Sequence, residues 1–359
     1  MTMKAITSAF ALLGLVALAA PAAAQTTRIS FGQAAPPSLA GAQVHVAQQL
    51  GYFREEGLEV EQRVFAGGVN SVNQTVNRQA DVSFPGNEPV IIGKQPGRDP
   101  LPVRFFYNAT PTLIWELIVP EASPIRTLQD LRGRTIGIFA PSASNVPQVR
   151  AILRREGINP DNQVTFRNIG LGAGALNAMT TNAVQVIALY DTEHATFETM
   201  GTQIRRLPQS PAVAPLFSNG LLTHEDNLRD PARRRMLVGV GRAIARATLF
   251  CETNPRACVT LTWRQFPETK PTGVDDARAL RDALFVLNSR LTNFRLRDYQ
   301  NGQYGLYEPA RWQAYVDFML AEQQIERPVD INTIFTNDLI AEINQFDRDA
   351  VRRQAQAAQ

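Results

Sequence analysis

Three histidines and two cysteines are the side chains of this sequence best suited to chemistry. His45, His194 and His224 lie far apart in the chain, and no HExxH, Gly-x-Ser-x-Gly, phosphate-loop or CxxC motif occurs. Residues 191–194, Asp-Thr-Glu-His, place two carboxylates beside a histidine, but directly after a predicted strand they are interpreted as a polar loop. The sequence therefore gives little support for an enzyme, and we expect no cofactor and no metal.

The two cysteines, Cys251 and Cys258, are seven residues apart. On one continuous helix that spacing corresponds to a rise of about 10.5 Å, which exceeds the roughly 4.4–6.8 Å between the Cα atoms of a disulfide. Asn254-Pro255 lies between them and favours the end of one helix and the start of another. A structural disulfide is the main interpretation, with buried free thiols and a metal or redox site as alternatives.

The N-terminus indicates export. Lys4 precedes an apolar run over residues 5–20, followed by Ala22-Ala23-Ala24, which is typical of a secretory signal peptide. We expect cleavage after Ala24 and a soluble exported protein. The formal net charge of +3 is too small to indicate nucleic acid as a partner.

Strand and helix patterns alternate along most of the chain. Strands are predicted at 27–31, 58–64, 80–84, 103–107, 113–119, 135–139, 164–169 and 184–190, with helices at 40–50, 69–79, 147–156 and 174–181. From about residue 230 the pattern is mainly helical, with Asp230-Pro231 as a helix start. Strand-helix-strand order favours parallel pairing. The predicted fold is therefore α/β, with two mostly parallel sheets flanked by helices.

The alternating pattern restarts near residue 113 and turns helical near residue 225, so we expect two lobes. The first lobe is assigned to residues 25–112 and 225–359, and the second to residues 113–224. Two connections should join them, near residues 110–113 and 217–228.

Ligands of open α/β sheets bind beyond the carboxyl ends of the strands. On the loops at those ends, the candidate ligand-binding residues are Gln33, Ser38, Asn87, Glu88, Asn108, Ser142, Ser144, Gly172, Tyr190 and Asp191. The rings of Phe84, Tyr107, Phe139 and Tyr190 are candidates for stacking on a ligand. Ser142 and Ser144 precede a predicted helix, whose free N–H groups favour an oxygen-rich group.

These loops contain no lysine and no arginine, but they contain Glu88, Asp191 and Glu193. A small anion is usually held by fixed positive charge. The loops therefore favour a nitrogen-containing heteroaromatic or amine-bearing ligand, with Glu88 or Asp191 accepting from an amino group. The alternative is nitrate, a sulfonate or another small organic anion, held at the helix that follows Ser144.

Four segments resemble, in order, motifs of one transport family. They are Leu-Gly-Tyr-Phe-Arg-Glu-Glu-Gly-Leu-Glu-Val at 50–60, Arg-Gln-Ala-Asp-Val at 78–82, Thr-Leu-Gln-Asp-Leu-Arg-Gly-Arg-Thr-Ile-Gly at 127–137, and Phe-Thr-Asn-Asp-Leu-Ile at 335–340. They resemble the substrate-binding proteins of ABC importers for thiamine pyrimidine precursors, alkanesulfonates, taurine and nitrate. Arg78 stands where that family usually has glycine.

The resemblance implies a bilobal periplasmic-binding-protein fold of type II with two crossovers. It also implies a small-molecule ligand in the cleft between the lobes, lobe closure, and an ABC permease in the inner membrane as the partner of a periplasmic monomer. Two other functions are considered. A sensory adaptor would present its ligand to a receptor instead of a permease, and an enzyme would resemble the family's pyrimidine synthases.

Overall fold

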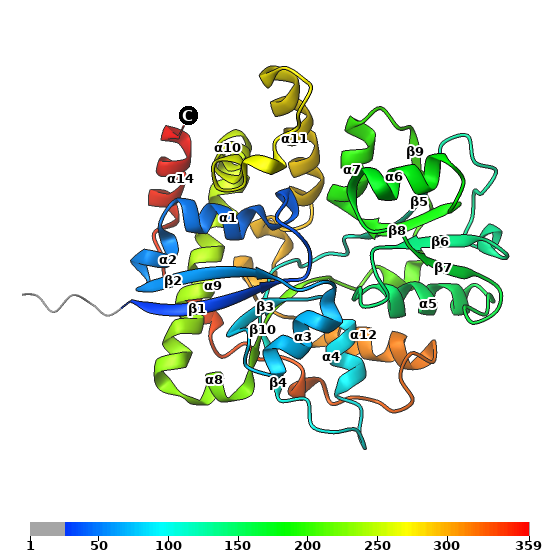
Figure 1. The fold of residues 1–359 in the computed structure, drawn as a ribbon. Coiled ribbons are helices and arrows are strands. Elements are labelled where there is room, and N and C mark those ends of the chain that lie inside the picture. Colours follow the sequence, from blue (N-terminus) through cyan, green and yellow to red (C-terminus); the bar gives the residue numbers. More distant parts are fainter. Residues whose placement is uncertain (1–25, 359) are drawn as a thin grey trace, which may run out of the picture.

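The computed structural model describes residues 26–358 and contains two five-stranded sheets, each flanked by helices (Figure 1). The predicted signal peptide, residues 1–24, lies outside the described residues. Within the described range, no helix combines the length and the apolar character that a bilayer crossing requires. We call the parts built on the two sheets the first lobe and the second lobe.

The sheet of the first lobe has the strand order β2-β1-β3-β10-β4. Its strands are β1 (Thr27–Gln33), β2 (Leu58–Val64), β3 (Val82–Phe84), β4 (Val103–Asn108) and β10 (Gly220–His224). Strand β1 pairs in parallel with β2 and β3, whereas β10 runs antiparallel to β3 and β4. This sheet is therefore mixed.

The sheet of the second lobe has the order β7-β6-β8-β5-β9 and is also mixed. Its strands are β5 (Trp115–Pro120), β6 (Thr135–Ile138), β7 (Thr165–Asn168), β8 (Val186–Tyr190) and β9 (Ile204–Arg206). Strand β6 is parallel to β7 and β8, and β5 is antiparallel to β8 and β9. In each sheet four of the five strands run in the same direction, as predicted, and one strand, β10 or β5, runs antiparallel to its neighbours. Strands β5 and β10 are the two that enter their sheets from the other lobe.

The chain crosses between the lobes in two connections, from β4 to β5 and from β9 to β10. Because β10 belongs to the first sheet, the second crossing is complete by Gly220. The expected second lobe, residues 113–224, thus includes one strand that pairs in the first lobe. The crossing itself lies at the predicted second connection, near residues 217–228, and only the strand β10 was not predicted.

Helices cover both faces of the two sheets (Figure 1). Between the strands lie α1 (Ala42–Gln49), α2 (Tyr52–Glu55), α3 (Gly68–Val76), α4 (Glu88–Gly93), α5 (Val146–Arg155), α6 (Gly172–Thr180) and α7 (Asp191–Thr199). Helix α7 replaces the expected polar loop at 191–194, because the carboxylates of Asp191 and Glu193 suit the first turn of a helix.

The C-terminal part is helical, as predicted, and packs mainly on the first lobe (Figure 1). Its α-helices are α8 (Glu225–Arg229), α9 (Pro231–Thr253), α10 (Pro255–Gln265), α11 (Asp276–Leu291), α12 (Pro309–Ala321), α13 (Ile340–Ile343) and α14 (Arg348–Ala357). Short 3₁₀ helices are η1 (Leu39–Gly41), η2 (Gln129–Leu131), η3 (Pro211–Val213), η4 (Pro267–Thr269), η5 (Leu296–Asp298), η6 (Gln300–Gly302) and η7 (Ile331–Thr333). The Asp230 carboxylate caps α9 by accepting from the N–H groups of Ala232 and Arg233.

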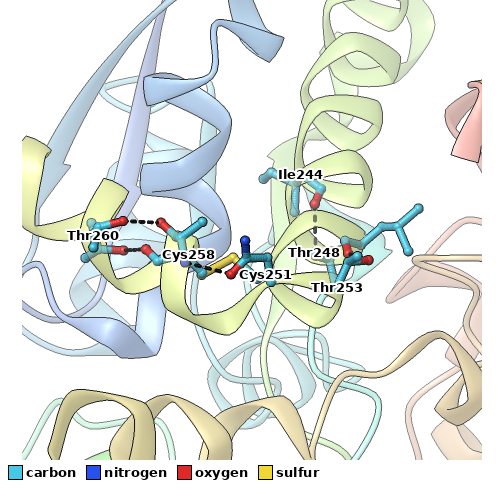
Figure 2. The surroundings of a disulfide bond; sticks show 10 residues. Ile244, Thr248, Cys251, Thr253, Cys258 and Thr260 are labelled. Carbon is cyan, nitrogen blue, oxygen red and sulfur yellow. Dashed lines mark hydrogen bonds between the residues drawn. A yellow bond between two sulfur atoms is a disulfide. The ribbon is translucent and has the colours of Figure 1, made fainter. Parts of the chain in front are cut away.

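The predicted disulfide between Cys251 and Cys258 is present (Figure 2). Helix α9 ends at Thr253, and the side chain of Asn254 caps α10 by accepting from the Ala257 N–H at 2.9 Å. This break brings the two cysteine Cα atoms to 5.0 Å, within the range of a disulfide. The bridge ties α9, whose apolar side packs in the core of the first lobe, to α10.

Candidate ligand-binding site

A cavity between the lobes, with a volume of about 740 Å³ including its open mouth, is the candidate site. The first lobe contributes the segment after β1, the start of α3, and side chains of α1 and α11. The second lobe contributes the ends of β6 and β8, the start of β5, and the residues before α5.

Four of the ten predicted ligand-binding residues line the cavity: Gln33, Ser38, Ser144 and Tyr190. Gln33 and Tyr190 are the last residues of parallel strands, as the carboxyl-end rule requires. Ser38 caps the short helix η1, and Ser144 precedes α5. Two of the predicted stacking rings, those of Phe84 and Phe139, also line the cavity.

The other six predicted residues lie outside the cavity lining: Asn87, Glu88, Asn108, Ser142, Gly172 and Asp191. Asn87 and Asn108 are buried and donate to backbone carbonyls, of Phe217 at 3.1 Å and of Leu306 at 3.4 Å. The Gly172 N–H donates to the carboxylate of Glu193. The polar groups of Asn87 and Asn108 and the backbone N–H of Gly172 are thus bonded within the protein.

Glu88 is completely buried, and its Oε1 accepts from the Tyr315 hydroxyl at 2.7 Å. Its Oε2 has no hydrogen-bond partner among the described residues, but the whole side chain lies outside the cavity lining, so the structure does not bring Glu88 to the cavity as predicted. Burial raises the pKa of this carboxyl to about 7. Tyr107, which was predicted to stack on the ligand, also lies outside the cavity lining, since its ring is packed in the core of the first lobe.

The Asp191 carboxylate is also bonded to other side chains of this protein and lies outside the cavity lining. Its Oδ1 accepts from Nε and Nη2 of Arg290, at 3.0 and 2.5 Å, and its Oδ2 accepts from Asn293 at 2.8 Å. Arg290 lies on α11 of the first lobe and lines the cavity. The expectation of a site without positive charge is therefore wrong, because Arg290 enters from a helix 99 residues after Asp191.

His45, on α1, lines the cavity and was not predicted. It is fully buried, and neither ring nitrogen has a regular hydrogen bond among the described residues. Burial lowers its pKa to about 4, against smaller raising effects of Gln62 and the Ser38 backbone. At neutral pH the imidazole is therefore uncharged and has one donor and one acceptor nitrogen.

Trp115 is the second unpredicted residue of the lining. It pairs across the sheet with Tyr190, and the two rings meet edge to face with their centroids 6.0 Å apart. Strand β5 runs antiparallel to β8, so the first residue of β5 lies beside the last residue of β8. Trp115 lies at the start of a strand, so the rule that ligands bind at the carboxyl ends of strands does not predict it.

Three glycines of the first lobe allow the second lobe to approach closely. A Cβ atom at Gly67 or Gly68 would overlap Ser142 or Ser144, and a Cβ at Gly86 would lie 2.5 Å from the Ser144 Cβ. The Ser144 hydroxyl instead accepts from the Gly86 N–H at 3.0 Å, and the Ser142 hydroxyl donates to the Ala66 carbonyl at 2.9 Å. This contact closes the cavity on the side of α3 and α5.

The family is decided by a match of residues 40–258 to the model described as NMT1/THI5 like. The chain belongs to the NMT1/THI5-like family. It is 26% identical over 335 residues to the riboflavin-binding protein RibY of Chloroflexus aurantiacus, covering 90% of this chain and 89% of RibY. This family membership agrees with the resemblance seen in the four sequence motifs.

Two solved structures show the same fold. The alkanesulfonate-binding protein SsuA of Xanthomonas axonopodis pv. citri, bound to MOPS, has a TM-score of 0.62 at 15% identity and covers 86% of this chain and 98% of its own. The desulfurization enzyme DSZB has a TM-score of 0.52 at 11% identity, and the match covers 88% of this chain and 98% of the DSZB chain. Binding proteins and an enzyme therefore share this fold. Among residues 26–358 of the present chain, no group of three or more His, Cys, Asp or Glu side chains could hold a metal ion.

The departure of this chain from the family pattern at Arg78 has a visible consequence. Arg78 has a φ of 58°, in the left-handed region where glycine is least strained. Its guanidinium pairs with Asp226, and both side chains are largely exposed. The substitution is thus accommodated at the surface, away from the cavity.

We predict that Gly68→Ala hinders the observed approach of the lobes, because the new Cβ would overlap the Ser144 hydroxyl and would still lie only 3.0 Å from the Ser144 Cβ after the hydroxyl rotates away. Small-angle scattering should give a larger radius of gyration than for the wild type, and the double variant Gly68→Ala/Ser144→Gly should restore the smaller value. Gly174→Ala is the matched control, since its Cβ would meet only the Ile169 carbonyl oxygen at 3.8 Å. Equal radii for Gly68→Ala and the wild type would contradict the role given to Gly68.

We predict that Glu88→Gln stabilises the protein increasingly as the pH rises from about 4.5 to about 7. The pKa of Glu88 is raised from 4.5 to about 7 in the folded state, so in this range the native wild type binds more protons than the unfolded chain and loses stability with rising pH. Relative to its value below pH 4.5, the difference in unfolding free energy between the variant and the wild type should increase by about 3 kcal/mol above pH 7. Urea unfolding at several pH values measures it.

The exposed Glu326→Gln is the control, and its difference from the wild type should not change with pH. A constant difference for Glu88→Gln would show that the carboxyl titrates normally. Comparison with the wild type at each pH cancels the opposite contribution of His45, whose lowered pKa makes the protein gain stability as the pH rises.

Proposed function

We propose that this protein is the substrate-binding component of an ABC importer and that it captures a small, neutral, nitrogen-containing heteroaromatic nutrient between its lobes. Membership of the NMT1/THI5-like family and the two-lobed fold support the binding role. The chemistry of the cavity supports the ligand class. We further propose that it acts as a periplasmic monomer, presenting its ligand to a permease in the inner membrane.

The observation that carries the ligand class is an aromatic cavity without net charge. Trp115, Tyr190, Phe84 and Phe139 supply ring surfaces. Arg290 is the only charged side chain among the described residues of the lining, and the Asp191 carboxylate neutralises it. Burying a flat, uncharged ring against these side chains is favourable, whereas a buried unpaired charge would be costly.

Uncharged polar groups can read the edge of such a ring. The amide nitrogen of Asn219 donates to the Phe84 carbonyl at 3.4 Å. The amide oxygen, Oδ1, is buried and has no partner among the described residues, so it can accept from a ligand. Gln33 donates through Nε2 to Gln62 at 3.1 Å, so its Oε1 can accept. With the neutral imidazole of His45, these groups match the mixed donors and acceptors of a nitrogen heterocycle.

The relatives favour two ligand classes. RibY is named for riboflavin, whose ring system is a nitrogen-containing heteroaromatic, and it aligns with most of this chain. SsuA binds MOPS, a sulfonate, and the presence of Arg290 in the lining favours a sulfonate as the second candidate. Because Arg290 is already paired with Asp191, a neutral ring fits the cavity better than a sulfonate.

Calorimetric titration with riboflavin and a thiamine-type aminopyrimidine, against MOPS and nitrate, tests this proposal. We expect micromolar or tighter binding of a heteroaromatic ring, weakened roughly tenfold by Tyr190→Ala or Trp115→Ala because each ring contact contributes about 1 kcal/mol or more. Phe285→Ala is the control, since Phe285 is half exposed on α11 and lies outside the cavity lining. Tight binding of MOPS or nitrate, with no binding of either heterocycle, would contradict the proposed ligand class.

A further inference from the structure

The pair of Arg290 and Asp191 is buried beside the cavity, with side-chain exposures of 3% and 5%. One carboxylate oxygen accepts from two guanidinium nitrogens, and the other accepts from Asn293. The Thr192 N–H also donates to this carboxylate, at 2.7 Å. The Asp191 carboxylate therefore accepts four hydrogen bonds, and two of the three guanidinium nitrogens are used.

The pair joins the two lobes. Asp191 begins α7 in the second lobe, and Arg290 lies near the end of α11, which packs on the first lobe; Figure 1 shows these helices side by side. The Arg290 Nη1 makes no hydrogen bond within the described part of the chain, and the guanidinium carbon lies 5.9 Å from the Tyr190 ring centroid. A neutral ligand acceptor can bind Nη1 without disturbing the pair.

We propose that Asp191 is a specificity-determining residue that occupies Arg290 in place of an anionic ligand group. A guanidinium is the preferred partner of a carboxylate or a sulfonate. In this protein that partner is already taken by the protein's own carboxylate. This inference rests on the proposed function in one respect, namely that the cavity is the ligand site.

The cost of displacement explains why an anion is excluded. A sulfonate that took Arg290 would leave the Asp191 carboxylate buried with only neutral donors, and a broken buried pair is strongly destabilising. A sulfonate that left the pair intact would lie close to a carboxylate of the same charge. Either arrangement disfavours an anion, whereas a neutral heterocycle meets neither cost.

Asp191→Asn tests the inference because it removes the charge and keeps the shape, and an amide oxygen can still accept from Arg290. We expect the wild type to bind MOPS weakly or not at all in calorimetric titration, and Asp191→Asn to bind it at least tenfold more tightly. Adding Arg290→Gln should abolish the gain. Glu193→Gln is the matched control: this neighbouring carboxylate of α7 bonds the Gly172 N–H, and its replacement should leave MOPS binding unchanged.

Circular dichroism and thermal unfolding check that each variant is folded. If Asp191→Asn does not fold, Asp191→Ser provides the same test, because its hydroxyl and a water molecule can satisfy Arg290 without charge. A folded variant that gains no affinity for MOPS would overturn the inference, as would tight MOPS binding by the wild type or an equal gain in Glu193→Gln.

The outcome also separates this inference from the ligand class proposed above. If the wild type binds no heteroaromatic ligand but Asp191→Asn gains MOPS binding, the role of Asp191 holds and the ligand class is wrong. If the wild type binds riboflavin and Asp191→Asn gains no MOPS binding, the ligand class holds and the role of Asp191 is wrong.

Discussion

The closed cavity depends on one steric constraint, the direct contact between the backbone of three glycines and the loop before α5. Gly67, Gly68 and Gly86 have no side chains, so Ser142 and Ser144 reach the backbone of the first lobe. This approach places the start of α5 and the ends of β6 and β8 opposite the segment after β1. A single methyl group at this contact would hinder the approach of surfaces that together form the ligand site.

Charge balance is the second property that defines the site. Lining side chains that can ionise are kept neutral or paired: burial lowers the pKa of His45 to about 4, and Asp191 balances Arg290. In a buried space an unbalanced charge costs much more than it does at the surface. This balance is the reason for proposing an uncharged ring, and not an anion, as the ligand. The same balance distinguishes this chain from a site built around a free cation for an anionic ligand.

The sequence predicted the fold where a local pattern controls the structure, and it failed where distant segments meet. Alternating strands and helices were visible from apolar periodicity, and Asn254-Pro255 indicated the break that allows the disulfide. The antiparallel β10 was missed because its partners lie more than 100 residues earlier in the chain. The carboxyl-end rule found Gln33 and Tyr190, yet it could not find Trp115 at the start of a strand or Arg290 on a later helix. The role of Asp191 was misread for the same reason, since its charged partner is invisible in the local sequence.

The central claim is that this cavity holds a neutral heteroaromatic ring. Native mass spectrometry of the protein, purified without denaturation from the cells that produce it, tests the claim most directly, because the ligand carried in the cavity is identified without a choice of candidates. We expect a co-purifying small molecule with a nitrogen-containing aromatic ring, released when the protein is denatured. A co-purifying sulfonate or nitrate, retained by the native protein and lost on Arg290→Gln, would contradict it.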